Sequence, residues 1–382
     1  AKDHGYVTAG DVVHGQYGSR ALELAVALTG VIATMPYIAL QLVGMTAVFK
    51  ALGLHGELPL AVAFIILALY TYSAGLRAPA LIAFVKDIMI YIVVIAAIAL
   101  IPAKLGGYAN VFAAADADFQ AKGAGSLLLG GNQYVAYATL ALGSALAAFM
   151  YPHTLTGIFA SSGGNTIRKN AVLLPAYTLL LGLLALLGYM GHAAGLKIAS
   201  NNDVVPALFK TLFPGWFAGF AFAAIAIGAL VPAAVMSIGA ANLFTRNFWK
   251  VWVNPAVTPA GEAQVAKVTS MLVKVGALLA ILLMPTQFAL DLQLLGGLWI
   301  LQTLPALVFG LYLNWFSSTS LLVGWAVGLA GGSWLAWSDG LKPLHSIDFG
   351  GGKVAIYTGL LALALNVVVA VAVNLVLKGV PQ

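Results

Sequence analysis

A hydroxyl group and a freed backbone carbonyl lie close together in the apolar segment 215–247, GWFAGFAFAAIAIGALVPAAVMSIGAANLFTRN. Pro232 has no N–H group, so the carbonyl of Gly228 loses its usual helical partner. Ala234 and Ser237 follow within about a turn. A small cation such as Na⁺ needs several hard oxygens, and a proline-bent helix offers carbonyls without burying a full charge. The segment therefore indicates one wall of a small polar site. The alternative is a tightly packed helix with a proline kink.

Isolated polar residues in other apolar runs are further candidates, because each costs free energy in hydrocarbon. Asp87, in LIAFVKDIMIYIVV, could face an inner aqueous cavity and bind or relay a cation; the alternative is an interfacial carboxylate paired with Lys86. Gln41, in ALQLVGM, could contact a solute or bond to another helix. Gln302 interrupts an apolar run, as do Gln293 and Thr303.

Two places predict broken helices. Pro152 and His153 interrupt AAFMYPHTLTGIFASS, and a broken helix beside a binding site is typical of transporters. The His153 ring could line that site or bond to the backbone at an interface. Gly296–Gly297 and Pro305, in QFALDLQLLGGLWILQTLPALVFG, predict a mobile, partly unwound helix.

The elements that must position these residues are membrane helices. The chain is 62% hydrophobic and 8% charged, with a mean hydropathy of +0.98, whereas a soluble domain carries about 25% charged residues. The apolar runs are continuous over roughly 20 residues, which excludes the alternating strands of a barrel. The chain is therefore predicted to be an all-α polytopic membrane protein with one transmembrane domain over residues 1–382. About ten spans are expected, at 21–47, 58–74, 78–102, 135–160, 170–195, 215–245, 267–286, 292–314, 319–337 and 354–377.

The positive charges predict the orientation of these spans. With the spans above, every arginine falls on one side of the membrane, while the lysines of the other side are diluted by acidic residues. The positive-inside rule makes the arginine side cytoplasmic, and an even number of spans places both ends of this chain there, in a plasma (inner) membrane. The arginines are Arg20, Arg77, Arg168 and Arg246.

The connecting segments carry fewer signals. The loop 104–134 is expected to hold a short amphipathic helix, whereas 196–214 and 338–353 carry Asn, Asp, Pro and Gly and are expected to be irregular. The polar beginning AKDHGYVTAGDVVHGQYGS resembles an internal loop, so upstream sequence is expected to be missing.

Several function classes lack support in the residues. No phosphate-binding loop, HExxH motif or Ser–His–Asp set stands out, so no enzyme and no cofactor are predicted. The +6 net charge is spread over loops, which suits a bilayer rather than nucleic acid. A channel would need rings of charge or a repeated filter sequence. A proton-pumping subunit would carry charged residues along midplane helices, and the midplane of this chain is expected to be almost uncharged.

Four segments, in consistent order, resemble the sodium:solute symporter family. GYVTAGDVVHGQYGSRALELAVAL resembles the start of its third core helix, and TYSAGLRAPALIAFVKD the turn between the fourth and fifth. YPHTLTGIFASS resembles the end of the sixth and ALVPAAVMSIGAANLFTRNFWK the eighth; the former, with LQTLPALVFGLY, also resembles the bacterial monocarboxylate permease branch. The resemblance implies a LeuT-type (APC-like) fold of two inverted repeats around a midplane site, with cation-driven uptake by alternating access. The first and second core helices would then be missing.

The resemblance also implies a cation site. Family members hold Na⁺ between the first and eighth core helices, so Ala234 would supply a carbonyl and Ser237 a hydroxyl. The next position is usually Ser or Thr but here is Ile238, which removes one oxygen. Coupling could then be weaker, be completed by water, or use H⁺. Asp87 matches a family aspartate near the inner exit path of the ion.

A substrate site is expected beside it. Ala147 and Ala148 leave room for a solute, and Gln41 and Gln302 are its candidate polar contacts. No cluster of hydroxyls and amides suits a sugar, and helix N-termini attract carboxylates, so a small organic acid is expected. The resemblance to the permease branch implies that this acid is a monocarboxylate. The predicted function is Na⁺-coupled import of that acid. The alternatives are coupling to H⁺, an amino acid or vitamin as substrate, or a passive channel.

Overall fold

The computed structural model describes residues 2–55, 58–74, 77–283, 290–348, 350 and 352–379. Within these residues, nine helices are long and apolar enough to cross a membrane. The run 58–74 forms one further helix, α3 (Leu58–Ala74), whose 17 residues stand at the short end of the spanning range. The predicted all-α, polytopic architecture is therefore confirmed. The Gly75–Leu76 turn of the family-like segment lies outside the described residues.

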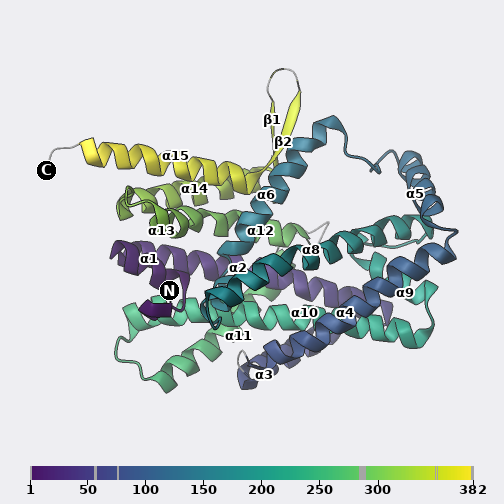
Figure 1. Cartoon of the computed structure of the whole chain (residues 1–382), viewed down its shortest axis with the longest axis horizontal. Helices are drawn as coiled ribbons and strands as arrows, with labels where there is room; N and C mark the ends of the chain where they lie inside the picture. Colours follow the sequence, from purple (N-terminus) through teal and green to yellow (C-terminus); the bar gives the residue numbers. More distant parts are fainter. Residues whose placement is uncertain are drawn as a thin grey trace.

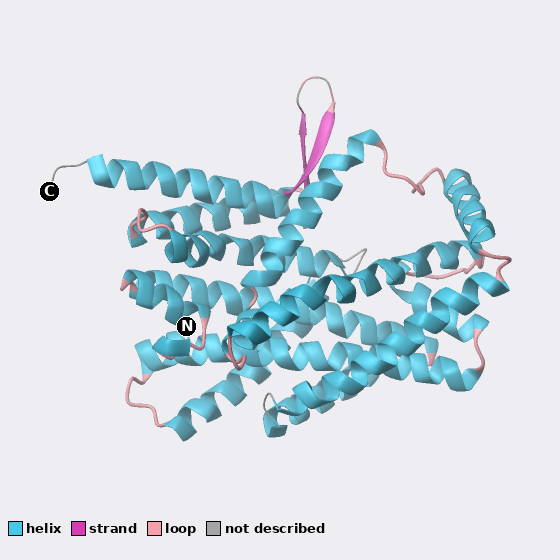
Figure 2. Ribbon diagram, in the orientation of Figure 1, coloured by secondary structure: helices cyan, strands magenta, loops and turns pink. Residues whose placement is uncertain are grey.

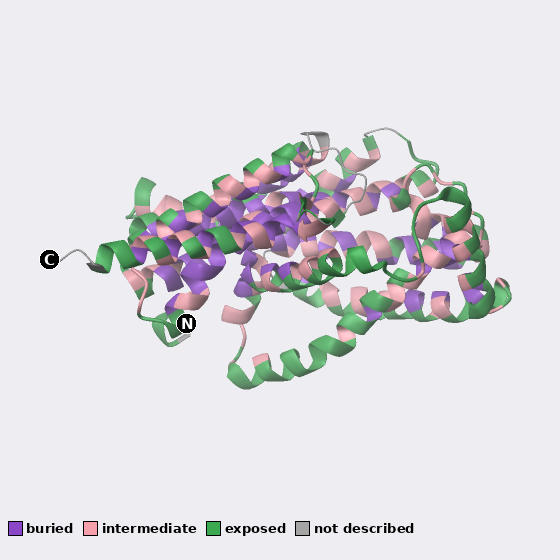
Figure 3. Ribbon diagram, turned by 90° about the horizontal axis from the view of Figure 1, so that it is seen from above, coloured by how far each residue is buried: buried purple, intermediate pink, exposed green. Residues whose placement is uncertain are grey.

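Two long helices form the centre of the bundle. α2 (Arg20–Ala51) and α10 (Gly215–Phe244) pack along each other, with α11 (Pro259–Leu283) and α12 (Leu290–Ile300) against α2 (Figure 1). Small residues at these contacts let the helices approach closely, as membrane packing requires. α2 and the span that begins with α12 are the most buried of the candidate spans. Figure 3 shows the buried residues gathered in the interior of the helix bundle.

The outer helices flank this centre. α14 (Ser318–Ser338) and α15 (Thr358–Gly379) form a pair at one side, and α4 (Arg77–Lys104) and α8 (Gly164–Ala193) cross the other (Figure 1). α8 is the least buried of the candidate spans. The first and last elements lie at the same end of the bundle, on the left of Figure 1, as an even number of spans requires. The cytoplasmic assignment of that end stays a prediction.

Of Pro36, Pro152 and Pro232, only Pro152 lies where one helix ends and another begins. α2 continues through Pro36 and α10 through Pro232. By contrast, α6 (Tyr134–Met150) ends at Tyr151, whose extended backbone (φ −62°, ψ 140°) precedes Pro152 at the first position of α7 (Pro152–Phe159). A residue before proline is driven out of the helical region, and proline suits a helix start. The break predicted at Pro152 is therefore present.

The partly unwound helix predicted at Gly296–Gly297 and Pro305 is present only around Pro305, and the break at the two glycines is wrong. α12 runs through both glycines, and the irregular backbone follows it, as a 3₁₀ turn at Leu301–Thr303 and a π-helical turn at Pro305–Phe309 before α13 (Gly310–Tyr312). The glycines serve packing instead, because a Cβ at Gly296 would lie 2.5 Å from the carbonyl oxygen of Ala33. Close backbone approach, rather than unwinding, explains this pair.

Two of the three connecting segments are more regular than expected. The helix expected in 104–134 is present as α5 (Tyr108–Lys122), but 196–214, expected to be irregular, contains α9 (Val204–Leu212). Leu208 and Phe209 of α9 are fully buried, so tertiary packing stabilises a helix that local sequence did not favour.

The segment 338–353 also differs from the prediction. It contributes β1 (Leu344–Asp348), which pairs antiparallel with β2 (Lys353–Tyr357); Figure 2 shows this hairpin projecting from the helices. The sequence between the two strands is rich in glycine, which is typical of the connection of a hairpin. The hairpin is anchored where the N–H of Tyr357 donates to Thr139 Oγ1 on α6 at 3.1 Å.

Asp118 fastens the connecting helix α5 to α8. Its Oδ2 lies 2.6 Å from Lys122 Nζ and 2.5 Å from Nδ1 of His192 near the end of α8. The hydrogen bond from Lys122, with that from His192, lowers the pKa of Asp118 below its usual value. A lowered carboxyl pKa stabilises the folded state above the unfolded-state pKa, of about 3.9, and this stabilisation is lost as pH falls through the folded-state pKa.

We therefore expect α5 to loosen in acid. Hydrogen exchange of the 108–122 backbone, corrected for its intrinsic pH dependence, should accelerate as pH falls below about 4. Asp118→Asn should remove this step and loosen α5 at neutral pH. Asp116→Asn is the matched control, because the Asp116 side chain bonds to Gln120 of the same helix. Equal acid sensitivity in the wild type and Asp118→Asn would contradict the assignment.

Candidate functional site

Ser237 lies inside the bundle, against α11. It is 0% exposed, and its Oγ donates to the carbonyl oxygen of Ala234 at 2.8 Å. Ser270 of α11, also buried, donates its own hydroxyl to Ser237 Oγ at 3.0 Å. This Ser237–Ser270 hydroxyl pair joins the two helices. Ser237 therefore contributes to a buried polar contact between spans rather than facing lipid.

A lysine continues the hydroxyl pair. Nζ of Lys274 lies 2.9 Å from Ser270 Oγ and 3.4 Å from the Ser270 carbonyl oxygen. Lys274 is 0% exposed and makes no ion pair with any residue that the structure describes. The expectation that the midplane is almost uncharged was wrong here, since Lys274 lies within the run 267–286. The serine four residues before it was the available signal, because that spacing places both on one helix face.

These groups form a poor sodium site. The carbonyl of Ala234 and the two hydroxyls are neutral oxygens, and each already has a hydrogen bond within this chain of contacts. The half-buried Ile238 adds no oxygen. Na⁺ prefers a shell of several oxygens, and here a lysine ammonium lies one hydroxyl away. The oxygens of the described residues therefore suit the lysine ammonium better than a bare metal ion.

Asp87 lies on α4 rather than at the hydroxyl pair. Its Oδ1 is 2.7 Å from Lys86 Nζ, and its side chain is 40% exposed. This is the paired arrangement that the sequence left open. α4 does pack against α10, since the Ile90 side chain approaches Gly228. The predicted exit-path role of Asp87 stays a prediction.

The predicted substrate residues have different surroundings. Ala147 is buried where α6 meets Gly297 of α12, whereas Ala148 is exposed. Gln302 is buried too, and its side chain donates to the Leu298 carbonyl.

Gln302 also accepts a hydrogen bond at 3.2 Å from Asn366 of α15, so its amide ties two spans together. Gln41 is half-buried on α2. The substrate roles of these four residues stay predictions.

An aromatic cluster marks the break between α6 and α7. The rings of Tyr37, Tyr151 and His153 lie with their centroids 4.9 to 5.6 Å apart. The hydroxyl of Tyr151 donates to the carbonyl of Gln293 on α12 at 3.1 Å. Neither tyrosine was singled out from the sequence, although Tyr151 adjoins the proline. The cluster connects α2, the break and α12.

Gly239 brings this break against α10. A Cβ at Gly239 would lie 2.9 Å from the backbone nitrogen of His153 and 3.0 Å from the carbonyl carbon of Pro152. Gly30 of α2 approaches the same proline from another side. The break therefore contacts α10 two residues beyond Ser237. The start of α7 and the buried hydroxyl pair therefore contact α10 on different faces of the same stretch.

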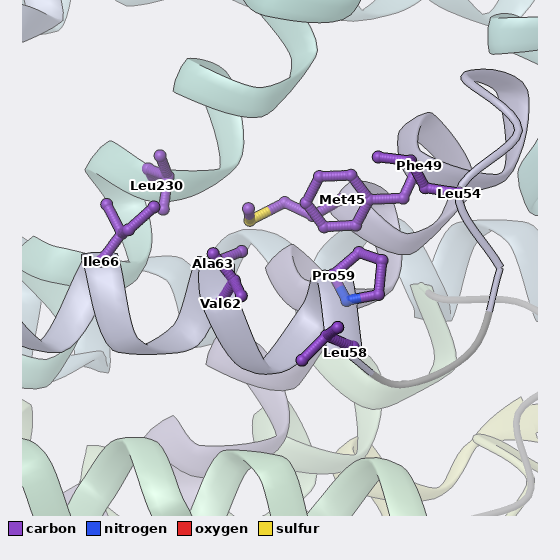
Figure 4. Close-up of a pocket in the computed structure, with 9 residues that line it drawn as sticks. All are labelled: Met45, Phe49, Leu54, Leu58, Pro59, Val62, Ala63, Ile66 and Leu230. Atoms are coloured by element: carbon purple, nitrogen blue, oxygen red, sulfur yellow. The ribbon is translucent and has the colours of Figure 1, made fainter.

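A separate hollow of about 360 Å³ lies between α2, α3 and α10. Figure 4 shows apolar side chains around it, among them Met45, Phe49, Leu58 and Leu230. Its lining contains no ionisable side chain, so it is distinct from the polar region at Ser237.

Comparisons with known proteins agree on one family. The sequence model described as "Sodium:solute symporter family" matches residues 2–328. A "Monocarboxylate transport permease protein" of Rhizobium johnstonii is 82% identical over 377 residues, covering 99% of this chain and 77% of that protein. The "Uncharacterized symporter YodF" of Bacillus subtilis is 30% identical over 338 residues, covering 86% of this chain and 67% of that protein.

A solved structure shares the architecture. It is titled "Substrate-bound outward-open state of a Na+-coupled sialic acid symporter reveals a novel Na+-site", and it matches with a TM-score of 0.76 at 15% identity. The match covers 98% of this chain and 78% of that chain. At this identity the likeness shows the fold alone.

Proposed function

The chain belongs to the sodium:solute symporter family and has its LeuT-type fold, and we propose that it imports a small monocarboxylate by cation-coupled symport. The family and the fold support a multi-pass membrane transporter with a small-molecule solute. The name of the 82% identical relative supports a monocarboxylate as that solute. Alternating access would then move one part of the bundle against the other around a midplane site.

The contact between Gly239 and the α6–α7 break is the observation that carries this proposal. It brings the N-terminus of α7, with its partial positive charge, against α10 at Gly239, while the hydroxyl pair at Ser237 lies on another face of the same helix, because residues two apart on a helix point to different sides. A substrate carboxylate is attracted to the positive end of a helix. We propose that the substrate carboxylate binds on the α7 side of α10 and that a positive charge lies on the other side, beside Ala234 and Ser237, supplied by the coupling cation or by a side chain that takes its place.

Coupling to H⁺ is the second candidate, and specific residues favour it. Ile238 removes an oxygen from the expected sodium shell, and Lys274 brings an ammonium next to it. Either ion would attract the carboxylate across the contact and so couple the two movements. In both versions Asp87 is proposed to lie near the ion's exit path on α4.

Uptake by the purified whole protein in proteoliposomes tests the function. An inward Na⁺ gradient and an inward H⁺ gradient are imposed in separate experiments. Under the gradient that drives transport, labelled lactate, pyruvate and acetate should each accumulate above the outside concentration, and each acid should inhibit uptake of the others. An ionophore that collapses the effective gradient should abolish accumulation. Uptake that only equilibrates would indicate a channel, and accumulation of amino acids that monocarboxylates do not inhibit would overturn the substrate class.

A further inference from the structure

We propose that the ammonium of Lys274 is the cation held by the Ser237–Ser270 hydroxyl pair, in the place where a sodium ion was expected. The lysine would hold α10 and α11 together there as a tethered cation. This inference rests on the proposed function only where uptake is measured, because sodium binding is tested separately.

The direction of the hydrogen bonds is the first support. Lys274 donates to Ser270, Ser270 donates to Ser237, and Ser237 donates to the carbonyl of Ala234. Every hydroxyl therefore turns an oxygen lone pair toward the lysine side and its proton away from it. A cation at the start of the series polarises each oxygen in this sense. The chain of contacts is ordered as it would be around a bound positive charge.

The surroundings of the lysine are the second support. Val273 and Ala277, the neighbours of Lys274 on α11, belong with Ala233 and Ala240 of α10 to one buried apolar cluster, and Lys274 is itself 0% exposed without an ion pair to any described residue. A charged side chain in the middle of a span is costly and needs a polar partner. Among the described residues, Ser270 supplies both of its hydrogen bonds. A purely structural contact between α10 and α11 would need only the two serines.

Competition for the same oxygens is the third support. A sodium ion at Ser237 would compete with Ser270 for the Ser237 oxygen and with the Ser237 hydroxyl for the Ala234 carbonyl, and it would be repelled by the ammonium one hydroxyl away. Ile238 offers no replacement oxygen. The two cations therefore exclude each other at this position.

Thermal unfolding of the detergent-purified whole protein, with NaCl compared with choline chloride, tests sodium binding without transport. The wild type should show no Na⁺-specific stabilisation that depends on Ser237, so Ser237→Ala and wild type should respond alike. Lys274→Ala with Ile238→Ser frees the pair and restores an oxygen, and it should gain Na⁺-specific stabilisation. A wild-type sodium response that Ser237→Ala abolishes would overturn the proposal, as would a double variant that folds but ignores Na⁺.

Uptake in proteoliposomes gives the second readout. Lys274→Met keeps the length and apolar stem without the charge, so it should fold and yet lose about tenfold in uptake. Relative to Lys274→Met, Lys274→Ala should show a partly restored uptake rate in Na⁺ but not in choline. Lys267→Met is the matched control, an exposed lysine on the same helix whose ammonium lies over the Tyr72 ring. Wild-type uptake by Lys274→Met would overturn the proposal.

If no monocarboxylate is taken up by the wild type, the proposed function fails while the unfolding comparison still decides the role of Lys274. If uptake occurs and Na⁺ stabilises the wild type through Ser237, the function stands and the tethered cation is overturned.

Discussion

Gly239→Val should abolish most of the uptake. The glycine meets the backbone of Pro152 and His153, which cannot move aside as a flexible side chain would. Overpacking of this kind costs about 1–3 kcal/mol or more, and roughly 1.4 kcal/mol corresponds to a factor of ten. We expect uptake per folded molecule to fall about tenfold or more, because α10 can no longer approach the α6–α7 break.

The control for this change lies on the same helix. Gly219→Val places the same side chain at an exposed position where a Cβ meets nothing within 4 Å. Its uptake and its elution as a monodisperse protein should match the wild type. Gly239→Ala should fall between the two. Normal uptake by folded Gly239→Val would show that the break and α10 do not need this contact.

Asn247→Ala should cause the largest loss of stability. Asn247 is fully buried in the π-helical continuation of α10, Thr245–Val253. Its amide donates to Asp11 and to Glu23 at 2.9 Å each, and its oxygen accepts from Thr8 at 2.7 Å. Removing it leaves the buried Glu23 carboxylate with fewer donors, a change that costs about 2–5 kcal/mol in comparable sites.

Thermal unfolding in detergent measures this loss. Asn254→Ala, at an exposed position directly after the same π-helical stretch, is the control and should unfold like the wild type. Glu23→Gln combined with Asn247→Ala should recover part of the loss, because the double variant no longer buries an under-solvated charge. Equal unfolding temperatures of Asn247→Ala and wild type would contradict a stabilising role for this network.

The network around Asn247 ties α1 (Ala9–Tyr17) to the end of α10. Thr8 caps α1 through the Asp11 amide, and the Asp11 carboxylate in turn lies 3.3 Å from Nε of Arg246. The sequence identified Arg246 as the end of the span but gave no partner for it. One of its partners, Asp11, lies 235 residues away along the chain and another is Glu262, and long-range pairs of this kind depend on which helices pack together.

The membrane helices were predictable from the sequence, and so was their family. Hydrocarbon offers the backbone no hydrogen-bond partner, so a long apolar run must satisfy its own N–H and C=O groups as a helix. That local requirement determines where spans begin and end. It also explains why the break at Pro152 was found, since proline changes the backbone of its own and the preceding residue.

The tertiary structure decided which polar groups meet. Local sequence could not show that α10 and α12 remain helical through Pro232 and Gly296, because close neighbours compensate for each disturbance. It also could not show that Ser237 faces Ser270 and Lys274. A helix presents side chains in every direction, and only its packing against other helices determines which of them are buried together.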